Sequence, residues 1–385
     1  MAEAVRVGLI GGGLMGREAA AAIARWPALE DHPVRPVLAG VCDTEPERLA
    51  WFERIDTAAL LTADHRELLA AKEIDVVYIA VPHHLHERLY LDAAAAGKDF
   101  LAEKPFGIDL AAGQRIVAAI ERAGVFVRCS SEMPFFPGAQ LAINEIRSGA
   151  LGRPIEAQAS FLHSGDIDPR KPINWKRQTR YCGELGVMGD LGVHALHVPL
   201  RLGWRPRTVY AATQDIVRER PGADGRSVPC DTIDNATLIA AVEHEHGDFP
   251  LTVETKRIAP GEANTWVLRA VGMNGGVEFS TRAPKTVRRF VLEDGRQAWQ
   301  ELQVGSQSVF PTVTGAIFEF GFADAILQMW AAFLAERAGA LGDSFGCLTP
   351  REALDAHRLF AAALRSSRSG RAEPTVGTVQ AADCP

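Results

Sequence analysis

The sequence predicts an α/β protein with two domains, the first built on a doubly wound parallel sheet and the second on a large, open, mostly antiparallel sheet. Three observations support this prediction. Strand-like and helix-like segments alternate early in the chain, a glycine-rich turn joins the first strand to the first helix, and several β-like segments follow one another later. The 385 residues suffice for two domains of about 150 residues each. We place them at 1–130 and 131–370, with a C-terminal tail at 371–385.

The glycine-rich turn matches the pattern G-x-G-x-x-G between an apolar strand at 5–10 and an alanine-rich helix. Gly11 permits the tight turn, Gly13 lets the backbone approach a pyrophosphate, and Gly16 allows close packing of helix on strand. The phosphates would rest on N–H groups at the start of the helix. The pattern predicts a Rossmann domain that binds a dinucleotide. The residues expected at the phosphates are Gly11, Gly13, Leu14, Met15 and Gly16.

The second strand, at 37–43, ends in an acidic residue, Asp43. A carboxylate at this strand end accepts hydrogen bonds from ribose hydroxyls and repels a 2′-phosphate. We therefore expect the cofactor to be NAD rather than NADP.

Polar residues also follow the strands at 75–81 and 99–102. The carboxyl ends of parallel strands line the cofactor crevice, so these residues should converge there. We interpret His83 and His84 as loop residues rather than catalysts, and Glu103 as a group that positions Lys104 or the nicotinamide ribose. The residues expected at the cofactor from these strand ends are Pro82, His86, Glu103 and Lys104.

The second half of the chain is rich in β-like segments separated by turn residues such as Asn274-Gly275 and Asp294-Gly295. A strand at 155–163 precedes them, and an apolar helix at 317–337 follows. An open sheet with helices on one face needs a partner for its other face, so we expect a homodimer or homotetramer through this sheet. The β-like segments lie at 207–216, 235–243, 250–258, 265–272, 276–281 and 286–293.

One stretch, 186–197, carries three polar side chains at helical spacing: Asp190, His194 and His197. In a helix, positions i, i+4 and i+7 share one face. A carboxylate one turn before an imidazole can fix its tautomer and stabilise its protonated form, as a general base requires. The alternative is an amphipathic helix with a few polar residues.

The motifs occur in the same order as in the Gfo/Idh/MocA family, named for glucose–fructose oxidoreductase and inositol dehydrogenase, and the chain resembles that family over nearly its whole length. The resemblance implies a Rossmann domain followed by an α/β domain with a large open sheet. It implies a nicotinamide-dependent reaction at a secondary alcohol of a sugar, cyclitol or glycoside. The motifs are Gly11–Gly16, Pro82–His86, Glu103-Lys104-Pro105 and Gly186–His197.

By this resemblance Lys104 takes the place of the family's active-site lysine, and Asp190 and His194 that of its Asp/His pair. His194, oriented by Asp190, would take the hydroxyl proton, and Lys104 would stabilise developing alkoxide charge. Many relatives carry aspartate at the position of His197, so its role stays open: it would bond the substrate, replace a carboxylate or act as an additional acid/base.

A long loop at 164–183 is rich in charged residues and proline, which is typical of a functional or mobile segment. Carboxylates and amines bond sugar hydroxyls, and an aromatic face stacks on sugar C–H groups. The alternative is a charged surface loop. The residues expected at a polyhydroxylated substrate are His163, Asp166, Trp175 and Lys176.

Three functions remain open from the sequence. The first is a dehydrogenase that exchanges NAD and NADH freely. The second is a redox-neutral glycoside-cleaving enzyme that keeps NAD bound and passes through a transient 3-keto sugar. The third is a non-catalytic dinucleotide-binding sensor, which would have no need of Lys104, Asp190 and His194 together.

Composition argues against several other classes of protein. A net charge of −7 with a pI near 5.9 gives no electrostatic footprint for nucleic acid. No apolar run approaches the ~20 residues of a membrane span, and the first strand leaves no room for a signal peptide. The six cysteines form no CxxC pair, so we expect reduced thiols in a cytoplasmic protein. We expect no metal ion, because hydride transfer needs none here.

Overall fold

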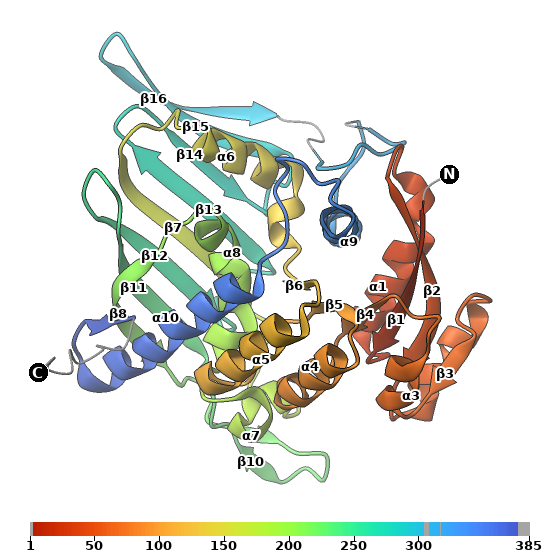
Figure 1. Ribbon diagram of the computed structural model, residues 1–385. Helices are drawn as coiled ribbons and strands as arrows, with labels where there is room; N and C mark the ends of the chain where they lie inside the picture. The colour runs from red at the N-terminus through yellow and green to blue at the C-terminus, as the bar shows by residue number, and fades with distance from the viewer. Residues whose placement is uncertain (1–2, 304–307, 316, 376–385) are drawn as a thin grey trace, which may run out of the picture.

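The computed structural model describes residues 3–303, 308–315 and 317–375. The first domain is a six-stranded parallel sheet in the order β3-β2-β1-β4-β5-β6 (Figure 1). This confirms the doubly wound sheet, whose central strands are apolar because both faces are covered. Its strands are β1 Glu3–Ile10, β2 Val34–Cys42, β3 Leu60–Thr62, β4 Val76–Ile79, β5 Asp99–Ala102 and β6 Val127–Cys129.

Helices connect these strands and pack on both faces of the sheet (Figure 1). The segment at 46–54, a single helix by sequence pattern, is divided into α2 and a 3-10 turn at Phe52–Arg54. Asp109 caps α5 by accepting a hydrogen bond from the N–H of Ala112 at 2.7 Å. The helices are α1 Leu14–Ala24, α2 Pro46–Ala50, α3 His65–Ala70, α4 His86–Ala95 and α5 Leu110–Ala123.

A helix from late in the chain, α9 (Phe322–Arg337), packs beside α1 on the first domain's sheet (Figure 1). This helix therefore packs with the first domain, although it lies within the range 131–370 that the sequence assigns to the second domain. The expected start at 317 is wrong: Ile317 and Phe318 are exposed, and the helix begins after Gly321. Asp324 fixes this start, because its carboxylate accepts a hydrogen bond from the Gly321 N–H at 2.8 Å.

The second domain is a nine-stranded sheet in the order β16-β15-β14-β13-β7-β12-β11-β8-β17. Neighbouring strands are antiparallel except for β7 and β12, which run parallel, so the predicted mostly antiparallel sheet is confirmed. Its longer strands are β7 Pro154–Leu162, β8 Pro206–Gln214, β11 Asn235–Val242, β12 Phe249–Lys256, β13 Thr265–Gly272, β14 Gly276–Ser280, β15 Thr286–Glu293 and β16 Arg296–Gln303. A separate two-stranded sheet joins β9 Glu219–Pro221 and β10 Ser227–Pro229.

Three helices lie against one face of the large sheet: α6 Pro137–Arg147, α8 Val193–Arg201 and α10 Pro350–Ser369 (Figure 1). Thr349 and Glu352 form a capping box at the start of α10. The helix also packs on α5, so it joins the two domains. Helix α10 continues to Ser369, and within the expected C-terminal tail at 371–385 a short strand, β17 (Glu373–Pro374), pairs with β8. The rest of that tail, 376–385, lies outside the described residues.

Within the described residues, no helix combines the length and apolar character that crossing a bilayer requires.

The packing of α9 predicts a large stability loss for Trp330→Ala. The Trp330 ring is fully buried and meets the Tyr78 ring edge-on, with centroids 5.4 Å apart. Removing a buried tryptophan typically lowers the free energy of unfolding by about 3–5 kcal/mol. Urea unfolding would measure this loss, with exposed Trp299→Ala as the control. A loss below about 1 kcal/mol would contradict the placement of α9 on the first domain's sheet.

Candidate active site

The glycine turn between β1 and α1 has the backbone that a pyrophosphate site requires. Gly11 has φ +107°, and a Cβ there would lie 2.2 Å from the Ala80 carbonyl oxygen. A Cβ on Gly16 would lie 2.0 Å from the Gly11 carbonyl oxygen. At Gly13, by contrast, a Cβ would meet no atom within 4 Å. Gly13 is also the N-cap of α1 and offers no side-chain cap, so no capping side chain occupies the N–H groups of the first helical turn.

Asp43 lies at the end of β2, with its carboxylate directed at this turn. Its Oδ2 accepts a hydrogen bond from the Gly12 N–H at 2.7 Å, and its Oδ1 accepts one from the Glu45 N–H at 2.9 Å. Arg48 lies 3.4 Å from Oδ2. The buried carboxylate thus has a fixed position beside the turn, which fits a ribose hydroxyl and opposes a 2′-phosphate. The turn, the open space above Gly13 and Asp43 together fit NAD.

The loops after β4 and β5 are tied together by His86. Its Nδ1 lies 2.7 Å from the Pro105 carbonyl oxygen, and its Nε2 lies 2.9 Å from that of Val81. The ring is fully buried, and burial lowers the pKa of His86 to about 4. The neutral ring has one N–H, so it donates to one of these two carbonyls, and it lies between the loops that follow β4 and β5. Pro82 opens the 3-10 turn that begins this connection.

Glu103 and Lys104 follow β5, and the bond from Lys104 to Pro105 is cis. The Tyr78 hydroxyl donates to Glu103 Oε1 at 2.6 Å, and the Lys104 N–H donates to Oε2 at 3.2 Å. The Tyr90 hydroxyl donates to the Glu103 carbonyl at 2.6 Å. These bonds hold the backbone from which the Lys104 side chain extends toward the second domain.

The Lys104 ammonium belongs to a cluster of charged side chains around the buried Asp190. Its Nζ donates to Asp190 Oδ1 at 2.9 Å and to the Asp190 carbonyl at 2.8 Å. Lys176 Nζ donates to both carboxylate oxygens, at 2.9 and 3.1 Å, and Arg257 Nη2 lies 3.8 Å from Oδ2. The structure thus brings together residues from the first domain, the long loop and the end of β12.

The cluster keeps its members charged. Burial opposes ionisation of Asp190, but the Lys104, Lys176 and Arg257 cations outweigh it and hold the pKa of Asp190 well below its ordinary value. Burial likewise opposes protonation of Lys104, but Asp190 and Glu103 raise its pKa above the ordinary value. Lys104 is therefore an ammonium at neutral pH, suited to stabilise negative charge on a substrate oxygen.

Asp190 does not lie in an α-helix, contrary to the sequence expectation. Met188–Gly192 forms a π-helical turn, and α8 begins only at Val193. A Cβ on Gly192 would lie 2.4 Å from the Phe360 ring, so this turn packs closely on α10. Among the described residues, no hydrogen bond joins Asp190 to His194. The expectation that Asp190 orients His194 by direct contact is therefore wrong, because its carboxylate is bound to the cations of the cluster.

His194 contacts a different pair of residues, which sequence reasoning missed. Its Nδ1 lies 3.1 Å from Ser131 Oγ and 3.7 Å from Glu132 Oε2, both just after β6. The Phe161 ring meets the imidazole edge-on, with centroids 5.2 Å apart. Burial, followed by the Lys104 cation, lowers the pKa of His194 well below its ordinary value. The ring is neutral at neutral pH and can accept a proton.

His197 lies one turn further along α8 and faces the interior. Its Nε2 lies 3.0 Å from the Gly346 carbonyl oxygen, and its ring packs between Phe135 and Phe345. It is fully buried, and burial lowers its pKa to about 3. The structure does not bring His197 to the Asp190 cluster. Among the described residues, no group of three or more His, Cys, Asp and Glu side chains could hold a metal ion.

The residues expected at the substrate divide into two groups. Lys176 belongs to the Asp190 cluster, and Trp175 beside it meets the His83 ring edge-on, with centroids 4.6 Å apart. His163 instead accepts a hydrogen bond from the Gly165 N–H at 3.0 Å, and Asp166 pairs with Lys171 at 3.1 Å. The latter two fix the loop.

His83 lies in the 3-10 turn between β4 and α4, in keeping with the expected loop position. It is buried, and within the described residues its Nδ1 has no hydrogen-bond partner. Burial lowers the pKa of His83 well below its ordinary value, so the ring is neutral. Its position directly after Pro82, at a strand end, was the available signal.

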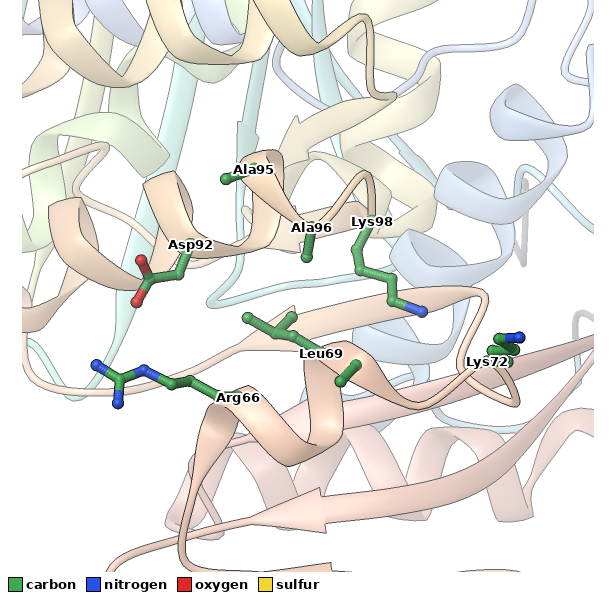
Figure 2. A pocket seen from close by; sticks show the side chains of 8 residues that line it. Arg66, Leu69, Lys72, Asp92, Ala95, Ala96 and Lys98 are labelled. Atoms are coloured by element: carbon green, nitrogen blue, oxygen red, sulfur yellow. The ribbon is translucent and has the colours of Figure 1, made fainter.

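A hollow between α3 and α4 lies elsewhere on the first domain (Figure 2). Lys98 crosses it and donates hydrogen bonds to the Ala71 and Ile74 carbonyls at 2.8 and 2.7 Å. Lys72 and Lys98 precede β4 and β5, whereas the site residues follow these strands. The hollow therefore lies at the amino ends of these strands, whereas the Asp190 cluster lies beyond their carboxyl ends.

The position of Asp43 predicts a change in cofactor preference. Asp43→Asn should weaken NAD binding about tenfold and improve the NADP-to-NAD ratio, because the repulsive charge is lost while an amide retains the shape. Titration of the protein with each dinucleotide measures both constants. Glu47→Gln, on exposed α2, is the matched control. An unchanged ratio would remove Asp43 from the ribose site.

Comparison with known proteins identifies both domains of this chain. Residues 5–131 match the oxidoreductase family with an NAD-binding Rossmann fold, and 140–278 match the GFO/IDH/MocA C-terminal domain. Levoglucosan dehydrogenase from Pseudarthrobacter phenanthrenivorans is 28% identical over 72% of this chain and 73% of its own length. D-apiose dehydrogenase from Paraburkholderia graminis is 30% identical, over 49% of this chain and 48% of its own.

Solved structures share the fold over the whole chain. An NAD-binding oxidoreductase from Klebsiella pneumoniae has a TM-score of 0.84 and 28% identity, covering 97% of this chain and 99% of that one. A levoglucosan dehydrogenase in complex with NADH has a TM-score of 0.86 and 24% identity, covering 97% and 100%. Both domain matches, the parallel sheet with its glycine turn and the large second sheet lead to one conclusion: the chain belongs to the Gfo/Idh/MocA family of NAD-binding oxidoreductases.

Proposed function

We propose that this protein is an NAD-dependent dehydrogenase that oxidises a secondary hydroxyl of a sugar, cyclitol or glycoside, with His194 as the base. The observation that carries the proposal is the Lys104–Asp190 pair at 2.9 Å, which places an ammonium of the NAD-binding domain inside the second domain. His194, whose imidazole is neutral, is the second residue of α8, which follows the turn that contains Asp190. Oxidation of an alcohol requires a base for the hydroxyl proton, which a neutral imidazole can be, and an ammonium can stabilise the negative charge that develops on the oxygen.

The chemistry divides among these residues. NAD, when bound, supplies the hydride acceptor. His194 takes the hydroxyl proton, and the Lys104 ammonium hydrogen-bonds the substrate oxygen and stabilises its developing negative charge. Asp190 holds Lys104 in place, and Lys176 and Trp175 bind further hydroxyl and C–H groups of the substrate.

A carbohydrate is the substrate class that two lines support. The relatives named above are levoglucosan and D-apiose dehydrogenases. The Lys176 ammonium lies over the Trp175 ring, 5.6 Å from its centroid, so this chain also brings together an aromatic ring and an ammonium, two groups that can bind polyhydroxylated ligands. A sensor would need neither Lys104 nor His194.

The proposal predicts that His194→Ala and Lys104→Met each lower kcat by about 100-fold or more, because each removes a group that acts on the reacting oxygen. The Asp43 region is unchanged, so NAD affinity should stay within about threefold. A panel of sugars, cyclitols and aryl glycosides, with NADH and released aglycone read separately, measures activity. Near-normal turnover in either variant would contradict the mechanism. Aglycone release without net NADH would assign the redox-neutral reaction instead.

We also propose a homodimer or homotetramer through the sheet face opposite α8 and α10. Tyr210 and Ile239 are direct cross-strand partners there and are 47% and 52% exposed. Ile239→Lys should disrupt the assembly, because burying a lysine ammonium in an apolar interface carries a large desolvation penalty. Light scattering after gel filtration gives the mass, with Glu293→Lys as the control. A monomeric wild type would overturn the proposal.

The described cysteines are free thiols, which supports the expected cytoplasmic location.

A further inference from the structure

The carboxylate of Glu132 faces the imidazole that the proposed reaction uses as its base. Glu132 follows β6, and its Oε2 lies 3.7 Å from His194 Nδ1. The side chain is 4% exposed, so a carboxylate that follows the last strand of the first sheet is buried beside the imidazole of α8. Burying a carboxylate is costly unless its surroundings compensate it.

Ser131 lies between the same elements and contacts the same ring nitrogen. Its Oγ is 3.1 Å from His194 Nδ1 and is also buried. Two oxygens therefore face Nδ1, so the tautomer with a proton on Nδ1 is favoured. That tautomer leaves the Nε2 lone pair available for a substrate proton.

We infer that Glu132 is the positioning residue of the base: with Ser131 it fixes the Nδ1–H tautomer of His194 and stabilises the imidazolium formed when Nε2 takes the hydroxyl proton. The inference rests on the proposed function and deepens it. In the step, the substrate O–H bond breaks, its proton forms a bond to Nε2, and the C–H hydride passes to NAD. The resulting positive ring lies beside the Glu132 carboxylate, and Asp190 remains committed to its three cations.

The charges around the two groups fit this division. Burial, together with the Glu103 carboxylate, raises the pKa of Glu132 to about 7, against the lowering effects of a hydrogen bond from its own backbone and of the Lys104 cation. The groups that act on His194 are Lys104, Asp190, His197 and Lys176. A carboxylate with a pKa near 7 is ionised above that pH, so its support for the imidazolium is present above about pH 7 and is lost as the pH falls.

The test compares Glu132→Gln with wild type on a sugar that reduces NAD. We expect kcat to fall about 10- to 100-fold with KM within about threefold, because the amide cannot stabilise the imidazolium. The decline of kcat below about pH 7 should also disappear, since the titrating group is gone. Glu132→Asp should restore a pH-dependent profile. Glu352→Gln, which changes another buried carboxylate and preserves the α10 capping box, is the matched control.

Further measurements separate this role from a structural one. Ser131→Ala should lower kcat less than Glu132→Gln and keep the dependence near pH 7, because the carboxylate remains. Wild-type kcat and pH profile in Glu132→Gln would overturn the inference alone. No NADH from wild type with any member of the panel would overturn the proposed function and this inference with it.

Discussion

The buried carboxylate of Asp190 is the interaction on which the arrangement of this protein depends. It lies in a π-helical turn and receives Lys104 from the NAD-binding domain, Lys176 from the long loop and Arg257 from the end of β12. Removing the partner of a buried charge is costly, so the largely buried Lys104 and Arg257 depend on the carboxylate, whereas Lys176 is partly exposed to solvent. One ionised group therefore joins both domains and the long loop at 164–183, beside the residues of the candidate active site.

The packing of the rest of the chain preserves this meeting point. Helix α9 covers the first domain's sheet although it comes late in the sequence, and α10 packs on both domains. Gly192 lets the π turn approach the Phe360 ring of α10, where a Cβ would clash. The turn that carries Asp190 is thus positioned by packing on α10 as well as by the cations, and the His194 ring is set separately by Ser131 and Glu132.

Much of the fold could be predicted because its causes are local. The alternation of strands and helices, the glycine turn and the acidic end of β2 are all periodic or positional signals, and a family resemblance supported Lys104, Asp190 and His194 as site residues. The contacts among them could not be predicted. A π turn has no 3.6-residue period to detect, so Asp190 and His194 were expected to meet directly. His197 shares the helix of His194, but its ring faces Gly346 and two phenylalanines.

Glu132 and His83 carried a signal that was available. Each comes a few residues after the carboxyl end of a parallel strand, somewhat later than Glu103 and Lys104 do, and such ends line the crevice. Their neighbours across the domain boundary depend on how two sheets dock, which no local pattern encodes.

The central claim is that Asp190 holds Lys104 and not His194, and a double-mutant cycle on stability tests it most directly. The free energy of unfolding is measured for Asp190→Asn, Lys104→Met, His194→Ala and the two double variants that include Asp190→Asn. The account predicts a coupling of about 1–3 kcal/mol between Asp190 and Lys104, and below about 0.5 kcal/mol between Asp190 and His194. A larger coupling to His194 than to Lys104 would contradict it.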